Sequence, residues 1–101
     1  ETSTGISNPN FYHVSDKLYP VSPNPASGKV KIGFTLGNSA MIDLKLYNTS
    51  GQEVSVLAAN QYYTQGLYDK DLDLSGLAAG EYILSLQVRD KKYEQRIMVA
   101  K

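Results

Sequence analysis

The chain has 101 residues, which is the usual content of one domain, and its ten basic and ten acidic residues give zero net charge. A neutral chain has no basic surplus for binding nucleic acid or for docking on an anionic membrane. It has no cysteine, which excludes disulfides, zinc–thiolate sites and cysteine nucleophiles, and no apolar run approaches the roughly 20 residues of a membrane-spanning helix.

The first seventeen residues differ in composition from the rest. Glu1 to Asn10 is rich in Ser, Thr and Asn and has neither the basic region nor the apolar region of a signal peptide. The chain does not begin with Met, so we expect it to derive from a longer protein. Residues 1–17 are predicted to be a linker from an upstream domain, and residues 18–101 are predicted to form one domain.

From Leu18 onward the pattern is that of β-strands. Apolar and polar side chains alternate in segments 29–36, 40–48 and 81–89, which puts one face of each strand in a core and the other towards water. Segment 52–60 is less regular and could begin as a strand and end as a loop. With turn signals such as Asn48-Thr49-Ser50-Gly51, the pattern predicts strands at about 18–22, 29–36, 40–48, 52–58, 67–74, 81–89 and 93–100.

Short strands separated by turns indicate an all-β, immunoglobulin-like antiparallel sandwich of about seven strands. The Cys and Trp residues typical of antibody domains are absent, so only the sandwich architecture is predicted and not an antibody domain. No helix longer than two turns is expected after residue 28. The predicted core consists of Val30, Ile32, Phe34, Ile42, Leu44, Leu46, Leu84, Leu86, Val88, Ile97 and Val99.

The sequence contains little that points to catalysis. His13 is the single histidine and lies in the predicted linker, where no scaffold would hold it as a base. Asp69, Asp71 and Asp73 share one face of a predicted strand and could be read as a calcium site. Successive carboxylates on a strand are about 7 Å apart, so a solvated face is the favoured interpretation. We predict no enzyme, no metal and no cofactor.

The eight tyrosines raise the question of sugar binding. Tyr62 and Tyr63 are adjacent and would point to opposite faces of a strand. Tyr47 and Tyr82 fall near strand ends, where half-buried tyrosines often lock the corners of sandwiches, so structural roles are favoured. Asn48-Thr49-Ser50 matches a glycosylation sequon but reads equally as a plain turn, which is favoured.

Four short motifs follow one another along residues 18–101. They are Tyr19-Pro20 with Pro23-Asn24-Pro25-Ala26-Ser27-Gly28, the stretch from Leu46 to Val54, the stretch from Leu77 to Leu84, and the closing stretch from Arg96 to Lys101. In this order they resemble the motifs of the C-terminal sorting domains of the type IX secretion system (type A, the Por secretion family). The signal residues that the resemblance marks are Pro23, Asn24, Pro25, Gly28, Leu46, Tyr47, Asn48, Gly51, Gly80, Tyr82, Ile97, Met98, Val99 and Lys101.

Two positions depart from the family pattern. Val21-Ser22 is inserted where the family more often runs Tyr-Pro-Asn-Pro directly, and Ala100 separates the last apolar triplet from Lys101.

The resemblance implies a non-catalytic C-terminal signal. Such a domain directs a periplasmic cargo protein through the type IX outer-membrane translocon, to the outer-membrane surface or the medium. A sortase-like protease at the cell surface usually removes it. The implied partners are the translocon, this protease and an upstream cargo domain, with no nucleic acid and no cofactor.

The residues alone leave two kinds of binding module open. Segment 93–101 is predicted to be an edge strand whose backbone could pair with another sheet, which fits a secretion signal. Gly28, Gly51 and Gly80 are expected to serve turns rather than contacts. The alternative is an accessory carbohydrate-binding β-sandwich of a secreted hydrolase.

Overall fold

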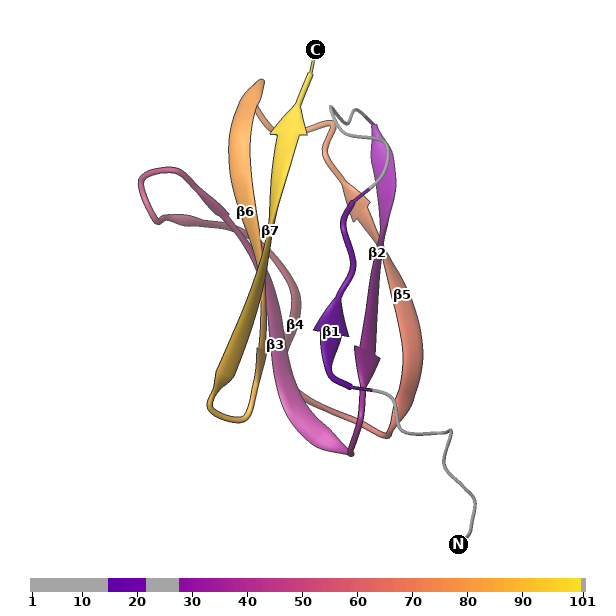
Figure 1. Cartoon of the computed structure of the whole chain (residues 1–101). Coiled ribbons are helices and arrows are strands. Elements are labelled where there is room, and N and C mark those ends of the chain that lie inside the picture. The colour runs from indigo at the N-terminus through magenta and orange to yellow at the C-terminus, as the bar shows by residue number, and fades with distance from the viewer. Residues whose placement is uncertain (1–14, 22–27, 101) are drawn as a thin grey trace, which may run out of the picture.

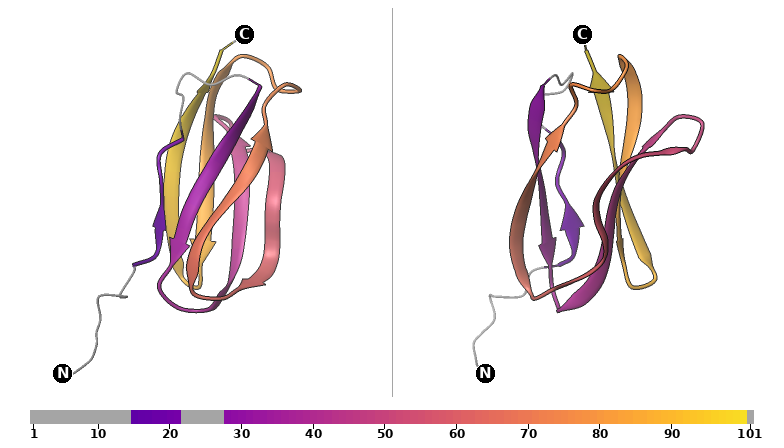
Figure 2. Two further views of the ribbon diagram at one scale, coloured as in Figure 1. Left: turned by 90° about the vertical axis from the view of Figure 1, so that its right-hand side faces the viewer. Right: turned by 180° about the vertical axis from the view of Figure 1, so that it is seen from behind.

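The computed structural model describes residues 15–21 and 28–100, which form two antiparallel sheets packed face to face (Figures 1 and 2). One sheet has the order β1 (Lys17–Leu18), β2 (Lys29–Leu36), β5 (Gly66–Asp73). The other has the order β4 (Glu53–Tyr63), β3 (Ala40–Asn48), β6 (Gly80–Val88), β7 (Lys91–Val99). The predicted seven-stranded sandwich is confirmed. In the described residues no helix is long and apolar enough to cross a membrane.

The core lies between the two sheets and is built by the alternation seen in the sequence. All eleven predicted core residues are buried, and Phe34, Ile32, Ile42, Leu44, Leu46, Leu84, Leu86 and Ile97 are fully inaccessible. The core also takes residues beyond that prediction: Leu18, Val21, Leu36, Ala40, Ala58, Leu72, Leu74 and Tyr82.

Most strand limits agree with the prediction within one or two residues. β2 and β3 have the predicted limits, and β5 and β6 each begin and end one residue earlier. β7 begins at Lys91 rather than at residue 93, because Val88 pairs directly with Lys91. Only Arg89 and Asp90 remain to form the loop between β6 and β7, and the φ angle of Arg89 is 56°.

β4 is longer than predicted. A strand over 52–58 followed by a loop was expected, whereas β4 continues to Tyr63. Its pairing with β3 shifts register at three places, which is typical of β-bulges. At one of them Asn60 has a φ angle of 48° and donates its backbone N–H to Oδ1 of Asp43, 2.8 Å away. The bulges interrupt the alternation without ending the strand.

The strand predicted over 18–22 is much shorter. β1 contains Lys17 and Leu18, and the N–H of Tyr19 still donates to the carbonyl of Gly33 at 2.9 Å. Pro20 has no N–H to continue the ladder, although Val21 is buried in the core. Ser22 lies outside the described residues.

The segment before β1 is attached to the sandwich as far back as Ser15. The carbonyl of Ser15 accepts a hydrogen bond from the Thr35 hydroxyl, and Oδ1 of Asp16 accepts one from the Gly37 N–H, both at 2.8 Å. Residues 1–14 lie outside the described residues, as does His13, so a linker over residues 1–17 remains a prediction.

The connections between strands gather at two opposite ends of the sandwich (Figure 1). One end, here called the motif end, carries Gly28, the turn 48–52, the connection 74–80 and the end of β7. The register supports this grouping, because Lys29 pairs with Asp73 and Gly80 pairs with Val99. The other end, here called the proximal end, carries residues 15–17 and the connections 37–39, 64–65 and 89–90.

Candidate functional site

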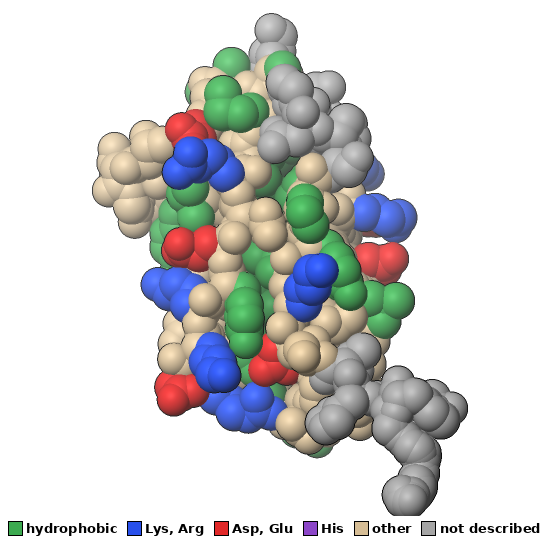
Figure 3. Space-filling view, viewed as in Figure 1, with side chains coloured by type: hydrophobic (Ala, Val, Ile, Leu, Met, Phe, Trp, Pro, Cys, Tyr) green, Lys and Arg blue, Asp and Glu red, His purple; other side chains and the backbone are tan. Residues whose placement is uncertain are grey.

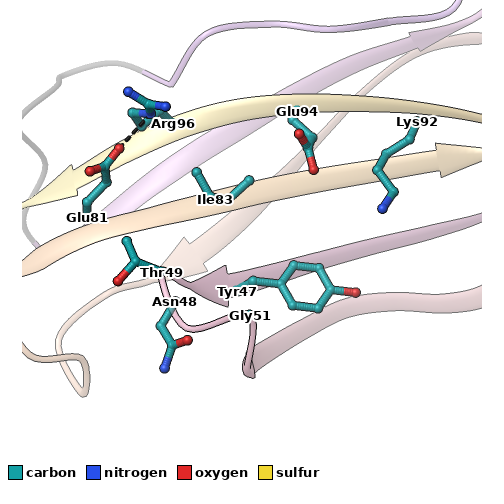
Figure 4. A pocket seen from close by; sticks show the side chains of 9 residues that line it. All are labelled: Tyr47, Asn48, Thr49, Gly51, Glu81, Ile83, Lys92, Glu94 and Arg96. Atoms are coloured by element: carbon teal, nitrogen blue, oxygen red, sulfur yellow. Dashed lines mark ion pairs between the residues drawn. The ribbon is translucent and has the colours of Figure 1, made fainter.

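A groove on the outer face of the four-stranded sheet runs up to the motif end (Figure 4). It has a volume of about 580 Å³ and is lined by Tyr47, Asn48, Thr49, Gly51, Glu81, Ile83, Lys92, Glu94 and Arg96. Tyr47 pairs with Ile83, and Ile83 pairs with Arg96, so these three side chains form a row across the face. The alternation that buries Leu46 and Ile97 places their neighbours in this groove.

The charges lining the groove balance each other. Nε of Arg96 lies 2.6 Å from Oε2 of Glu81, and Lys92 and Glu94 follow along β7 (Figure 4). Two acids and two bases therefore line a surface without net charge. None of these four residues was among the predicted signal residues. The strict alternation of β7 is the signal that could have indicated a shared outer face for Lys92, Glu94 and Arg96.

A second ion pair lies at the edge of this face, between Nζ of Lys45 and Oε1 of Glu53 at 3.4 Å. The hydrogen bond and charge of Glu53 raise the pKa of Lys45 above its ordinary value. The pair therefore stabilises the fold below the ordinary lysine pKa, and this contribution is lost as the pH rises through the raised pKa. Because Lys45 and Glu53 are partly solvated, this contribution is small.

Asn48 organises the turn between β3 and β4. Its Oδ1 accepts hydrogen bonds from the N–H of Ser50 at 3.0 Å and of Gln52 at 2.9 Å, and its Nδ2 donates to Oε1 of Gln52. Gly51 has a φ angle of 86°, which glycine adopts at little cost. The interpretation of Asn48-Thr49-Ser50-Gly51 as a turn, with Gly51 serving it, is confirmed.

Tyr82 locks the opposite side of the motif end. Its side chain is only 7% exposed, and its hydroxyl donates to the carbonyl of Ala78 at 2.7 Å. This is the arrangement of a tyrosine corner, in which a tyrosine fixes the connection that precedes its own strand. Gly80, with a φ angle of 150°, allows the chain to turn into β6. The expected structural role of Tyr82 is confirmed.

The predicted signal residues divide into two groups in the structure. Leu46, Tyr82, Ile97 and Val99 are buried, so their side chains hold the fold. Tyr47 and Asn48 are half-buried, and Gly28, Gly51 and Met98 are exposed, Met98 to 44%. Gly80 is half-buried at the start of β6. Pro23, Asn24, Pro25 and Lys101 lie outside the described residues.

The row of aspartates has the orientation that the sequence predicts. Asp69, Asp71 and Asp73 are exposed, whereas Leu72 and Leu74 point into the core. Oδ1 of Asp71 lies 3.0 Å from Nζ of Lys31 and raises the pKa of that lysine. In residues 15–21 and 28–100, no group of three or more acidic or histidine side chains could hold a metal ion.

Of the tyrosines in the described part of the chain, Tyr47, Tyr62, Tyr63 and Tyr68 do not share one stacking surface. Tyr63 and Tyr68 pack on Phe34, with ring centroids 5.6 and 5.5 Å from it, whereas Tyr62 points outward and is 63% exposed. The predicted opposite orientation of Tyr62 and Tyr63 is confirmed. Tyr62 pairs with Met41, which is six residues from Tyr47 along β3, or roughly 20 Å. Tyr47 and Tyr62 are therefore too far apart to stack on one sugar ring.

Two comparisons place the chain among known proteins. The profile of a family described as "Secretion system C-terminal sorting domain" matches residues 18–100. The chain is also similar to CopC from Methylosinus trichosporium OB3b, a crystal structure with 21% sequence identity and a TM-score of 0.50. That alignment covers 86% of this chain and 97% of CopC, and it concerns the fold alone. No curated protein sequence matches the chain significantly.

Proposed function

Because the chain belongs to the family of secretion system C-terminal sorting domains, we propose that it is a non-catalytic signal for type IX secretion. In this proposal it directs an attached cargo protein from the periplasm through the outer-membrane translocon. The cargo then reaches the outer-membrane surface or the medium, and a sortase-like protease removes the domain.

The observation that carries this proposal is the extent of the family match. It spans residues 18–100 and so includes β2 to β7 completely, together with the buried Leu18 of β1. The matched unit is thus the whole sandwich, which favours a signal that is read in its folded form. Burial of Leu46, Tyr82, Ile97 and Val99 agrees with this reading, because these side chains lie in the core.

A folded signal also fits the position of the last strand. β7 lies at an edge of the four-stranded sheet. The side-chain amide of Gln95, a residue of β7, donates from Nε2 to the carbonyl of Leu18 at 3.0 Å. β7 is therefore attached to β6 by its backbone and to β1 by this side chain. We propose that the translocon reads the folded surface together with this strand.

The test is export of a reporter. The whole chain is fused to the C-terminus of a periplasmic reporter in a host with a type IX system, and in the same host lacking the translocon. We expect the reporter at the surface or in the medium of the first host and in the periplasm of the second. Retention in the periplasm of both hosts would contradict the proposed function.

A further inference from the structure

The chain has equal numbers of acidic and basic residues and therefore no net charge at neutral pH. Acidic and basic side chains are interspersed over the face that Figure 3 shows, so neither sign dominates that face. Without a net charge, overall electrostatic repulsion does not keep two copies of the domain apart. Local features must do so instead, above all at the sheet edges, where strands of different molecules can join through their backbones.

The described part of the chain has four edge strands, which lie on two sides of the sandwich. On one side, the bond from Gln95 of β7 to the carbonyl of Leu18 of β1 bridges the two sheets. On the other side lie β5 and β4, which no backbone hydrogen bond joins among the described residues (Figure 2). A groove of about 520 Å³ separates these two strands and is lined by Ser55, Val56, Leu57 and residues 69–73. This second side is therefore open to an added strand.

The two open edges differ in regularity. β4 shifts register against β3 at three places, and such bulges make an edge a poor template for another strand. β5, in contrast, pairs with β2 through eight consecutive residues, from Gly66 to Asp73, without a shift. It also contains no proline. The backbone of β5 is thus the regular edge on this side, and its side chains decide what can pair with it.

Lys70 places a charge on the core-facing side of β5. It pairs with the fully buried Ile32, and paired residues of adjacent strands point to the same face. Its Nζ lies 5.9 Å from the ring centroid of Tyr63 in β4, on the other side of the groove. Among the described residues no acidic group forms an ion pair with Lys70. A strand added to β5 would cover this ammonium group and remove it from water, which is costly for an unpaired charge.

The opposite side of β5 carries exposed aspartates at alternate positions, namely Asp69, Asp71 and Asp73. When two strands pair, outward residues of one lie opposite outward residues of the other. If two copies of β5 paired antiparallel about Asp69, Lys70 or Asp71, Asp69 would face Asp69, Asp71 or Asp73 of the other copy. Like charges directly opposite each other destabilise a sheet.

The neighbouring strand does not remove this repulsion. Lys31 of β2 lies 3.0 Å from Asp71 and partly compensates its charge. Asp69, however, pairs across the sheet with Gly33, which has no side chain to offer an opposite charge. Asp69 is therefore the position at which a second copy meets an uncompensated negative charge.

We propose that Lys70 and the outward aspartates prevent β5 from pairing with a second copy of this chain. The aspartates act on the outer face of the edge by repulsion, and Lys70 acts on the inner face through its hydration. The inner residues that a second β5 would bring are Tyr68, Lys70 and Leu72, none of which is acidic. The edge thus discriminates against its own copy, and this inference does not depend on the proposed function.

The test measures self-association of the whole chain by sedimentation equilibrium. The triple variant Asp69→Thr, Lys70→Met, Asp71→Thr removes three charges and keeps side chains that suit a strand. It has nine basic and eight acidic residues, so its net charge moves away from zero, which by itself would oppose association. We expect its association constant to exceed that of the unmodified chain by about tenfold or more.

The matched control is the variant Asp69→Glu, Lys70→Arg, Asp71→Glu, which retains all three charges and should associate no more than the unmodified chain. Thermal unfolding verifies that both variants are folded. If the first one is not, Lys70→Met is compared with Lys70→Arg in the same way. In the associated variant, amide hydrogen exchange should slow in residues 67–73 and remain unchanged in β7.

Three results would overturn the inference. The first is a charge-free variant that associates no more than the unmodified chain. The second is equal association of the charge-retaining variant, because side-chain size rather than charge would then be responsible. The third is slowed exchange in β4 or β7 with none in β5, because another edge would then be the one that pairs.

Discussion

Individual hydrogen bonds at the motif end have a clear structural role, and the one at Tyr82 can be tested without disturbing the packing. The Tyr82 hydroxyl donates to the carbonyl of Ala78, and the ring is buried. Tyr82→Phe keeps the ring and leaves that carbonyl without this donor. We expect the free energy of unfolding to fall by about 1 kcal/mol in urea titrations.

Tyr47→Phe is the matched control for that experiment. The Tyr47 side chain lies half-buried in the outer groove, so its hydroxyl can be removed with a change of less than about 0.5 kcal/mol. Equal losses in the two variants would contradict the structural role assigned to Tyr82.

Arg89 occupies a backbone conformation that favours glycine. Its φ angle is 56°, and its guanidinium donates to the carbonyl of Ser39 at 3.1 Å and lies 3.5 Å from Oδ2 of Asp16. The Arg89 side chain thus links the β6–β7 loop to Asp16, in the segment that precedes β1. The backbone of Arg89 is strained in this arrangement, because its φ angle is positive.

Two substitutions separate the strain from the contacts. Arg89→Gly and Arg89→Ala both remove the guanidinium, but only glycine relieves the positive φ. We expect the glycine variant to be more stable than the alanine variant by about 1 kcal/mol in chemical denaturation. An alanine variant as stable as the glycine variant would mean that the loop rearranges without cost.

The elements could be predicted from the sequence where their pairing is regular. β2 and β3 have the predicted limits because their apolar residues alternate over their whole length. β4 could not be predicted beyond residue 58, because its three register shifts depend on the partner strand and on bonds such as that from Asn60 to Asp43. The candidate site could not be predicted from the sequence either. The row formed by Tyr47, Ile83 and Arg96 depends on the register between β3, β6 and β7, which local sequence patterns do not specify.

The last strand is the element on which the sorting signal is expected to depend. Deletion of residues 97–101 is expected to abolish export while an upstream cargo still folds. The deletion removes Ile97 and Val99, whose buried side chains each contribute roughly 1.5–3 kcal/mol, a large share of the roughly 5–15 kcal/mol of a small domain. The measurement is reporter export alongside thermal unfolding.

Lys101→Ala distinguishes the two causes that such a deletion combines. A terminal side chain is expected to change stability by no more than about 0.5 kcal/mol. If Lys101→Ala blocks export with an unchanged melting curve, the end of the chain is read directly. If only the deletion blocks export, the folded sandwich is read. Normal export after the full deletion would contradict the sorting function.

At the scale of the whole molecule, the sandwich is expected to resist proteolysis better than the segment before it. Peptide bonds within paired strands are not accessible to a protease without local unfolding. In limited proteolysis followed by mass spectrometry, we expect the earliest cuts within residues 1–17. Early cuts inside residues 29–100, with residues 1–17 intact, would show that the linker prediction is wrong.

The placement of the two chain ends at opposite ends of the sandwich has a mechanical consequence. A pulling force applied between Lys17 and Val99 acts along the strands rather than across them. β7 pairs with β6 through nine residues, from Lys91 to Val99, so such a force loads their hydrogen bonds together in shear. Bonds loaded together in shear resist far more force than bonds opened one after another. In the proposed function, such a force would reach an attached cargo through a domain that remains folded.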